Sequence, residues 1–430
     1  MKLDGNVMLD TMSDVDERLI LESDIAQEQK AVDKRTKKRF IITGSAITAV
    51  MTAAAIAVTF VPWKSENNVI VPDLLPMLTV NDNQMGSFGF SAIGVEALEK
   101  HKAAMSGQDQ KFTEMPVYNS SSLSFETSDK IKKKLKETVE YFGLDYDSMR
   151  ISDNTIDQEH AENFKKKFKE DYNEVTEEEL DRMVQVMRAN ADITAYTPDD
   201  DTSEISYISV SADMSIHIVM DDDNSFKLPD EYSFGNNSTL EELEEAGRYL
   251  LDKYSGLVNI NDPVFSEYES TNNDYSGAAV FYENGTYPAE SIANQSIKQV
   301  KFFGHNNRLT VMTIFEEYTL CEKIADYPII SEKEAEQLLR NGNYLSTIDS
   351  TMYTLKEDDE IGLSMLTYRS GRGYECIMPF YLFYVQIPEE EFYHEKGDLL
   401  YGLFYVPAVK GEYLENMPDP QISFNGAMIK

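Results

Sequence analysis

The sequence predicts an α+β protein in which a single transmembrane helix precedes an extracytoplasmic region of helix-plus-antiparallel-sheet units. A long uncharged apolar run near the N-terminus and amphipathic helices followed by alternating strands are the two main observations. The third is charge: 76 acidic against 39 basic side chains give a net charge of -37. This balance argues against nucleic acid as a partner, because phosphate binding needs a basic surface. With 42% hydrophobic residues, the charge must coat folded domains.

Residues 40–62 contain no charged side chain and predict a transmembrane helix over residues 40–63. At a rise of about 1.5 Å per residue they extend roughly 35 Å, enough to cross the hydrocarbon core. The basic run at 34–39 (KRTKKR) precedes them and Trp63 follows. This asymmetry predicts a cell-membrane protein with a cytoplasmic N-terminus and an extracellular C-terminal region. A cleaved signal peptide is the alternative, but the apolar run is longer than a usual signal core.

Residues 1–39 form the predicted cytoplasmic segment, which is too short to bury a core of its own. Its apolar residues recur at helical spacing, so that a helix would present one apolar stripe with acidic neighbours. An acidic helix suits an anionic inner leaflet poorly, which favours a protein partner. The predicted partner-binding residues are Met12, Val15, Asp16, Leu19 and Ile20.

Residues 8–23 (MLDTMSDVDERLILES), followed by the basic run and one anchor, resemble the N-terminus of membrane-bound anti-sigma factors. These belong to the extracytoplasmic-function systems of Firmicutes. The resemblance implies that the cytoplasmic segment binds a sigma factor and that the outer region senses an envelope signal. Residues 1–39 contain no His or Cys, so the zinc-bound cluster of some members is not expected. The alternative is a solvated leader that only sets topology.

The outer region divides into a weakly structured approach over 64–125 and two α+β subdomains over 126–235 and 236–430. Recurrence of helix followed by strands suggests internal duplication. Capping boxes are expected at Thr176 with Glu179 and at Ser331 with Glu334. Helices are predicted at 128–142, 177–190, 240–254 and 331–340. Strands are predicted at 205–210, 214–220, 278–282, 297–303, 309–315, 353–355, 361–368, 379–387 and 399–406.

Residues 331–339, 379–385 and 401–408 are similar to the C-terminal half of YycI-like and PepSY-like domains. Those are membrane-anchored, non-catalytic regulators of Gram-positive bacteria. The resemblance implies a second possible function, an accessory protein whose outer domain binds and modulates a sensor kinase or another envelope protein. The aromatic strands could form a recognition platform, or an edge strand could accept a peptide. Core packing is the favoured interpretation, because both faces of these strands are aromatic.

No HExxH, GxSxG, Walker A or GxGxxG motif is present, and the five histidines are not at metal-ligand spacing. The sequence therefore predicts a non-enzymatic protein, and we assign no catalytic, cofactor-binding or metal-binding residue. His217 is expected on the exposed face of its strand. Cys321 and Cys376 both lie in the outer region, where the environment permits a disulfide. Whether they form a bridge or two buried thiols is left open.

Overall fold

The computed structural model describes 75–80, 92–95, 98–99, 101–102, 112–121, 124, 127–172, 175–198, 203–221, 224–266, 277–348, 353–369, 376–387 and 399–418. All described residues belong to one compact unit. The predicted cytoplasmic segment and transmembrane helix lie outside the described residues. Among the residues that are described, no helix has the length and apolarity needed to cross a membrane.

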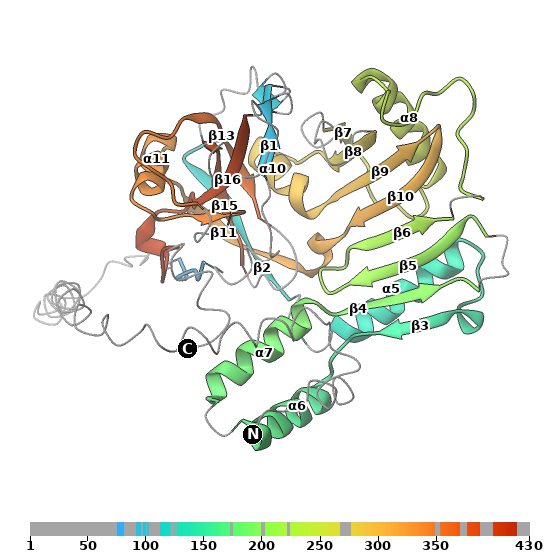
Figure 1. Cartoon of the computed structure of the whole chain (residues 1–430), viewed down its shortest axis with the longest axis horizontal. Coiled ribbons are helices and arrows are strands. Elements are labelled where there is room, and N and C mark those ends of the chain that lie inside the picture. The colour runs from blue at the N-terminus through green and yellow to red at the C-terminus, as the bar shows by residue number, and fades with distance from the viewer. Residues whose placement is uncertain are drawn as a thin grey trace, which may run out of the picture. The chain divides into compact units, whose positions relative to one another are not determined.

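The α+β class is confirmed for the described part of the chain, whose largest sheet has eight antiparallel strands (Figure 1). Their order is β3-β4-β5-β6-β10-β9-β8-β7. In chain order the strands are β3 (Arg150–Asp153), β4 (Asp192–Tyr196), β5 (Ile205–Ser211), β6 (Ile216–Met220), β7 (Pro263–Phe265), β8 (Ala278–Glu283), β9 (Gln299–His305) and β10 (Arg308–Phe315).

The sheet consists of two similar halves of four strands each, and the strand order of the second half is the reverse of that of the first. In the first half α5 (Thr127–Tyr141) precedes β3 to β6, and in the second α8 (Leu240–Lys253) precedes β7 to β10. The last strands of the halves, β6 and β10, pair at the centre. Buried residues of both helices join one hydrophobic core with the strands. The two halves therefore share one sheet and one hydrophobic core.

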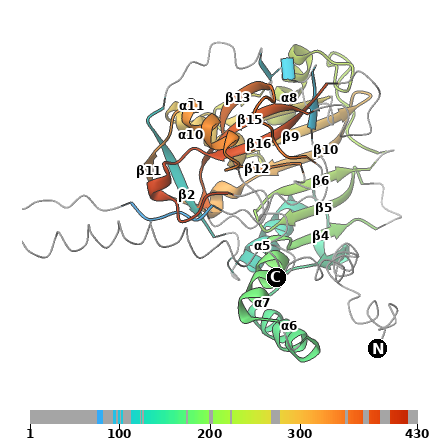
Figure 2. The ribbon, with the colours of Figure 1, turned by 60° about the vertical axis from the view of Figure 1, so that its left-hand side comes forward.

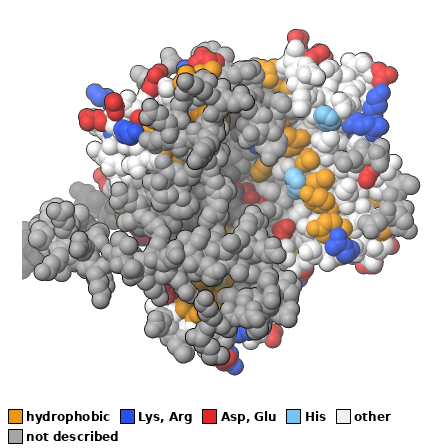
Figure 3. Space-filling model, viewed as in Figure 1, with side chains coloured by type: hydrophobic (Ala, Val, Ile, Leu, Met, Phe, Trp, Pro, Cys, Tyr) orange, Lys and Arg blue, Asp and Glu red, His pale blue; other side chains and the backbone are white. Residues whose placement is uncertain are grey.

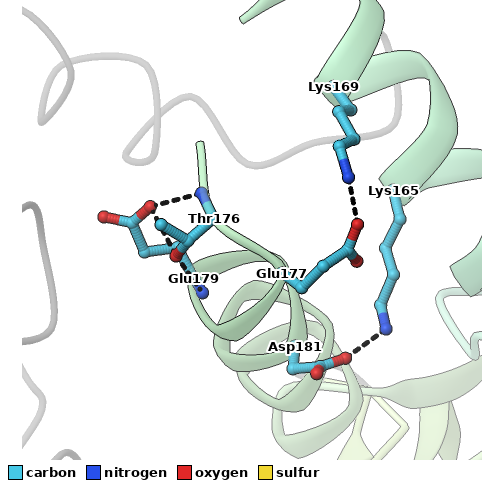
Figure 4. Close-up of polar contacts among 6 residues, drawn as sticks. All are labelled: Lys165, Lys169, Thr176, Glu177, Glu179 and Asp181. Atoms are coloured by element: carbon cyan, nitrogen blue, oxygen red, sulfur yellow. Dashed lines mark hydrogen bonds and ion pairs between the residues drawn. The ribbon is translucent and has the colours of Figure 1, made fainter. Parts of the chain in front are cut away.

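Local sequence accounts for the helices of the first half. Ile131, Leu135 and Val139 lie on one face of α5 and are buried, as their spacing predicts. The connection from β3 to β4 contains α6 (Gln158–Asp171) and α7 (Glu177–Ala189). The Thr176 and Glu179 capping box is confirmed at the start of α7, and Lys165 and Lys169 of α6 form ion pairs with Asp181 and Glu177 of α7 (Figure 4).

Two smaller sheets contain the remaining strands, and α10 (Pro288–Ile297) contacts strands of all three sheets. The five-stranded sheet has the order β1-β16-β15-β13, with β12 paired to β16, and α11 (Glu332–Arg340) packs on β16. The three-stranded sheet has the order β11-β2-β14. The bounds are β1 (Ala92–Gly94), β2 (Glu114–Ser120), β11 (Cys321–Pro328), β12 (Leu345–Ser346), β13 (Ile361–Tyr368), β14 (Cys376–Ile377), β15 (Pro379–Ile387) and β16 (Leu400–Pro407), with short 3-10 helices η1 (Tyr146–Ser148), η3 (Glu317–Leu320) and η5 (Gly411–Tyr413).

The expectation of a weakly structured approach over 64–125 requires correction at β2. Glu114–Ser120 is the central strand of its sheet, with β11 on one side and β14 on the other. Met115 and Val117 are completely buried and belong to different hydrophobic clusters. Because a strand between two cores need not alternate apolar and polar residues, the sequence pattern did not reveal it.

The aromatic strands β15 and β16 are core elements, which confirms the favoured interpretation. Residues 379–385 are all buried, and β15 lies between β13 and β16. Tyr381 and Phe383 face one cluster, whereas Leu382 and Tyr384 face another. The capping box of Ser331 with Glu334 is confirmed at the start of α11.

Cys321 and Cys376 are both free in the structure, and the strand order explains why they do not form a disulfide. Cys321 pairs with Ser120 of β2, and Cys376 pairs with Asn119 on the other side of the same strand. Because β11 and β14 lie on either side of β2, two strand spacings, about 10 Å, separate the two cysteines. This exceeds the Cα–Cα distance of roughly 7 Å that a disulfide can bridge. Their partners are consecutive residues, so the thiols also face opposite sides of the sheet. Burial raises the pKa of both thiols, that of Cys376 to about 12.

Candidate functional site

The two faces of the eight-stranded sheet differ in composition. One face contributes the hydrophobic core under α5 and α8. In Figures 1 and 2, α5 lies behind β4 and β5, and the other face of these strands is toward the viewer in Figure 1. We call this other face, from β3 to β9, the row face, because residues in register across the strands form two rows of different chemistry.

The first row is aromatic and aliphatic, and the second is hydroxylic with two basic side chains. Strand pairing places the members of each row side by side. The first row is Arg150, Tyr196, Tyr207, Val219, Val311 and Phe303. The second row is Ser152, Thr194, Ser209, His217, Thr313 and Lys301.

Ring contacts connect the start of the first row. The Arg150 guanidinium carbon lies 4.1 Å from the centroid of the Tyr196 ring. The Tyr196 and Tyr207 centroids are 5.6 Å apart at an interplanar angle of 45°, and Tyr207 is 6.2 Å from the His217 ring at 42°. All three rings are half-buried, and burial, with a contribution from Tyr196, raises the pKa of the Tyr207 phenol. Beyond Arg150, the first row is therefore apolar, and its rings are tilted against one another.

Hydrogen bonds order the second row. Thr194 Oγ1 donates to Ser209 Oγ over 3.0 Å, and Ser209 Oγ donates to Asp192 Oδ2 over 3.3 Å. His217 Nδ1 lies 3.0 Å from Thr313 Oγ1, so the expectation of a simply exposed histidine needs correction: the ring is half-buried. In a nucleophilic triad, histidine stands between the nucleophile and the acid. Here Asp192 accepts a hydrogen bond directly from Ser209, with no histidine between them. The carboxylate therefore fixes the positions of the Ser209 and Thr194 hydroxyls.

The row face is long and narrow, and its charge differs from that of the chain. Six strands at about 4.8 Å spacing give each row a length of roughly 24 Å. The rows include Arg150, Lys301 and His217 but no carboxylate; Asp192 lies beside them and accepts a hydrogen bond from Asn154. Figure 3 shows hydrophobic side chains and two histidines at the surface over this sheet. This combination suits recognition of a linear amphipathic ligand.

The predicted partner-binding residues all lie outside the described residues: Met12, Val15, Asp16, Leu19 and Ile20. Within the described ranges, no three His, Cys, Asp or Glu side chains are grouped to hold a metal ion. The row face was not found from sequence. Alternation in 205–210 and 214–220 indicated which residues face away from the core, but only strand register shows that they form rows.

Comparisons with known proteins leave identity open. No family model and no curated protein matches the chain. Among solved structures, the chain is similar to an uncharacterized protein from Eubacterium rectale ATCC 33656. The identity is 12%, the match covers 71% of this chain and 85% of that chain, and the TM-score is 0.29. These values are too low to support an inference about fold or function.

Proposed function

We propose that this protein is a single-pass membrane regulator of the anti-sigma type. Residues 1–39 bind a sigma factor in the cytoplasm, residues 40–63 cross the membrane, and the outer region receives an envelope signal. The observation that carries the proposal is the uncharged run at 40–62 with its basic flank, preceded by an amphipathic acidic segment.

The outer region acts in this proposal as a recognition domain, with the row face as its receiving surface. Half-buried aromatic side chains beside ordered hydroxyls are the residue types that protein surfaces use for specific recognition. Binding there would change the state of the outer region and, through the anchor, the availability of the sigma factor.

A capture experiment tests the cytoplasmic half of the proposal. Residues 1–39 serve as bait in a cell lysate, and the matched control carries Val15→Ser, Leu19→Ser and Ile20→Ser. We expect one sigma factor to be retained by the native bait and lost with the control, because the substitutions remove the apolar stripe. Retention of no specific protein, or equal retention by both baits, contradicts the anti-sigma function.

The row face also favours a second candidate, a non-catalytic accessory protein that binds and modulates a sensor kinase or another envelope protein. The two functions differ in what the inner segment must do. Replacing residues 1–39 by an unrelated sequence of equal length and charge abolishes regulation in the first case. In the second case regulation persists, because the outer region makes the necessary contacts.

A further inference from the structure

We infer that the row face binds an amphipathic helix of a partner protein, one whose apolar stripe is flanked by acidic side chains. The inference deepens the proposed function by naming the partner's chemistry. It depends on that function only in assuming that the outer region meets its partner at this surface.

The spacing of the first row fits a helix laid across the strands. Neighbouring members of the row are about 4.8 Å apart, the distance between strands. Successive stripe residues of a helix, three or four positions apart, advance about 4.5–6 Å along its axis. An apolar stripe can therefore meet Tyr196, Tyr207, Val219, Val311 and Phe303 in turn, and about 16 residues of helix span the row.

The charged side chains of the rows favour acidic residues on either side of the helix's apolar stripe. Arg150 begins the first row and Lys301 ends the second, while the nearby Asp192 accepts hydrogen bonds from Asn154 and Ser209. An acidic flank would meet a cation at each end of the row face, whereas a basic flank would be repelled there. A second copy of this chain suits the face poorly, because it would bring the same cations together.

The orientation of the rings disfavours a glycan. Sugar rings stack on flat, accessible aromatic faces, but the Arg150 guanidinium already covers the Tyr196 ring. Tyr207 is tilted by 45° against Tyr196 and by 42° against His217, and Val219 and Val311 occupy the middle of the row. Such an uneven apolar line favours interdigitating side chains, as in protein interfaces.

Binding of designed peptides to the full chain in mild detergent tests the inference. The first probe is an 18-residue helical peptide with a leucine stripe flanked by Glu. A second peptide has Lys in place of each Glu, and a third has Ser in place of each Leu. Fluorescence anisotropy at low and physiological salt should show binding of the first peptide only. Tyr207→Ser should weaken its affinity about tenfold or more, as loss of a central aromatic anchor does.

A charge-reversal variant tests the same surface without removing a buried side chain, because Arg150 is exposed. Combined Arg150→Glu and Lys301→Glu substitutions should transfer binding from the Glu-flanked to the Lys-flanked peptide. Tyr172→Ser and Lys166→Ala, at exposed positions of the α6 region, are the controls and should leave affinity unchanged. Equal binding of the Glu and Lys peptides, no binding of any peptide, or binding unaffected by the row-face variants would overturn the inference.

Two further probes identify the alternatives. Binding of tetragalacturonic acid that is lost in Tyr207→Ser, without peptide binding, would show a glycan surface instead. Concentration-dependent self-association abolished by Arg150→Glu would show an interface between copies. Either outcome overturns the helix inference and leaves the sigma-factor capture result standing, so failure of the two proposals can be told apart.

Discussion

The two halves of the eight-stranded sheet have the same topology but use their second faces differently. In the first half, Tyr196, Tyr207 and Val219 are half-buried on the row face. In the second half, Ala278 and Val280, on the same side of β8, are 1% exposed. The inserted helices also differ, since α10 follows β8 and contacts both β8 and β13 of the five-stranded sheet. The row face therefore includes the first half together with β9 and β10 of the second half, whereas β8 contributes the same side to internal packing.

The faces under α5 and α8 are alike in the two halves, so they should respond alike to substitution. Consecutive phenylalanines on β9 allow the sharpest test of the difference between faces. Phe302 is completely buried in the core, whereas its neighbour Phe303 belongs to the row face.

The largest effect is expected for Phe302→Ala, which leaves a cavity in the shared core. The free energy of unfolding should fall by about 3–5 kcal/mol. Phe303→Ala should cost roughly 1–2 kcal/mol, because less apolar area is removed from contact. Urea unfolding of the full chain in mild detergent, followed by far-UV circular dichroism, measures both. Equal losses would contradict the distinction between the faces.

Removing the ion pair between α5 and the residue that follows β10 should have the next largest effect. Lys134 of α5 lies 2.5 Å from Glu316, which precedes η3, and their side chains are only 21% and 6% exposed. Lys134→Met leaves the buried carboxylate unpaired and should lower the free energy of unfolding by roughly 2 kcal/mol. The same urea titration applies. Lys136→Met, at an exposed pair on the same helix, is the control and should be neutral.

Gly247→Ala tests how closely α8 approaches the second half. An added Cβ would lie 2.4 Å from Phe281 Cε2 and 2.7 Å from the Ala279 Cβ. The clash should cost about 1–2 kcal/mol of unfolding free energy, outweighing the usual preference of helices for Ala. At exposed Glu245 on the same helix the order should reverse, with Ala more stable than Gly by about 1 kcal/mol. Thermal unfolding of the wild type and the three variants, Gly247→Ala, Glu245→Ala and Glu245→Gly, decides the sign.

The smallest effect concerns the link between α5 and β3. Burial tends to raise the pKa of Asp153, but hydrogen bonds from Thr155 and Lys132 outweigh it, so that the pKa lies below its ordinary value. The charged carboxylate therefore stabilises the folded state above the ordinary aspartate pKa, and this contribution is lost as pH falls through the lowered pKa.

Between about pH 6 and pH 3, the wild type should lose more unfolding free energy than Asp153→Asn. The difference should stay below about 1 kcal/mol, because the pair is partly exposed to solvent. Urea titrations across this pH range provide the measurement. A larger loss in the variant would show that Asp153 does not have a lowered pKa.

Local signals predicted α5, α7, α8 and α11 but not α6, α10 or β4, and residues 353–355, expected as a strand, form none. Helices α7 and α11 begin where Thr176 and Ser331 indicate. A capping box can be read from the sequence because its hydrogen bonds join residues only three positions apart. Alternation located β5, β6 and β10 to within two residues, and the β9–β10 turn adopts positive φ at Asn306 and Asn307. The similar capping box of Thr239 with Glu242 was present in the sequence and was not recognised.

The sequence by itself determined the α+β class, the starts of α5, α7, α8 and α11, and the buried faces of α5, β5 and β6, because these follow from contacts within a few residues. Only the tertiary structure decided that β6 pairs with β10, that β2 separates Cys321 from Cys376, and that Tyr196, Tyr207 and His217 become neighbours. Strand partners and register depend on pairings between distant segments, and one strand's residue pattern does not specify which strand lies beside it.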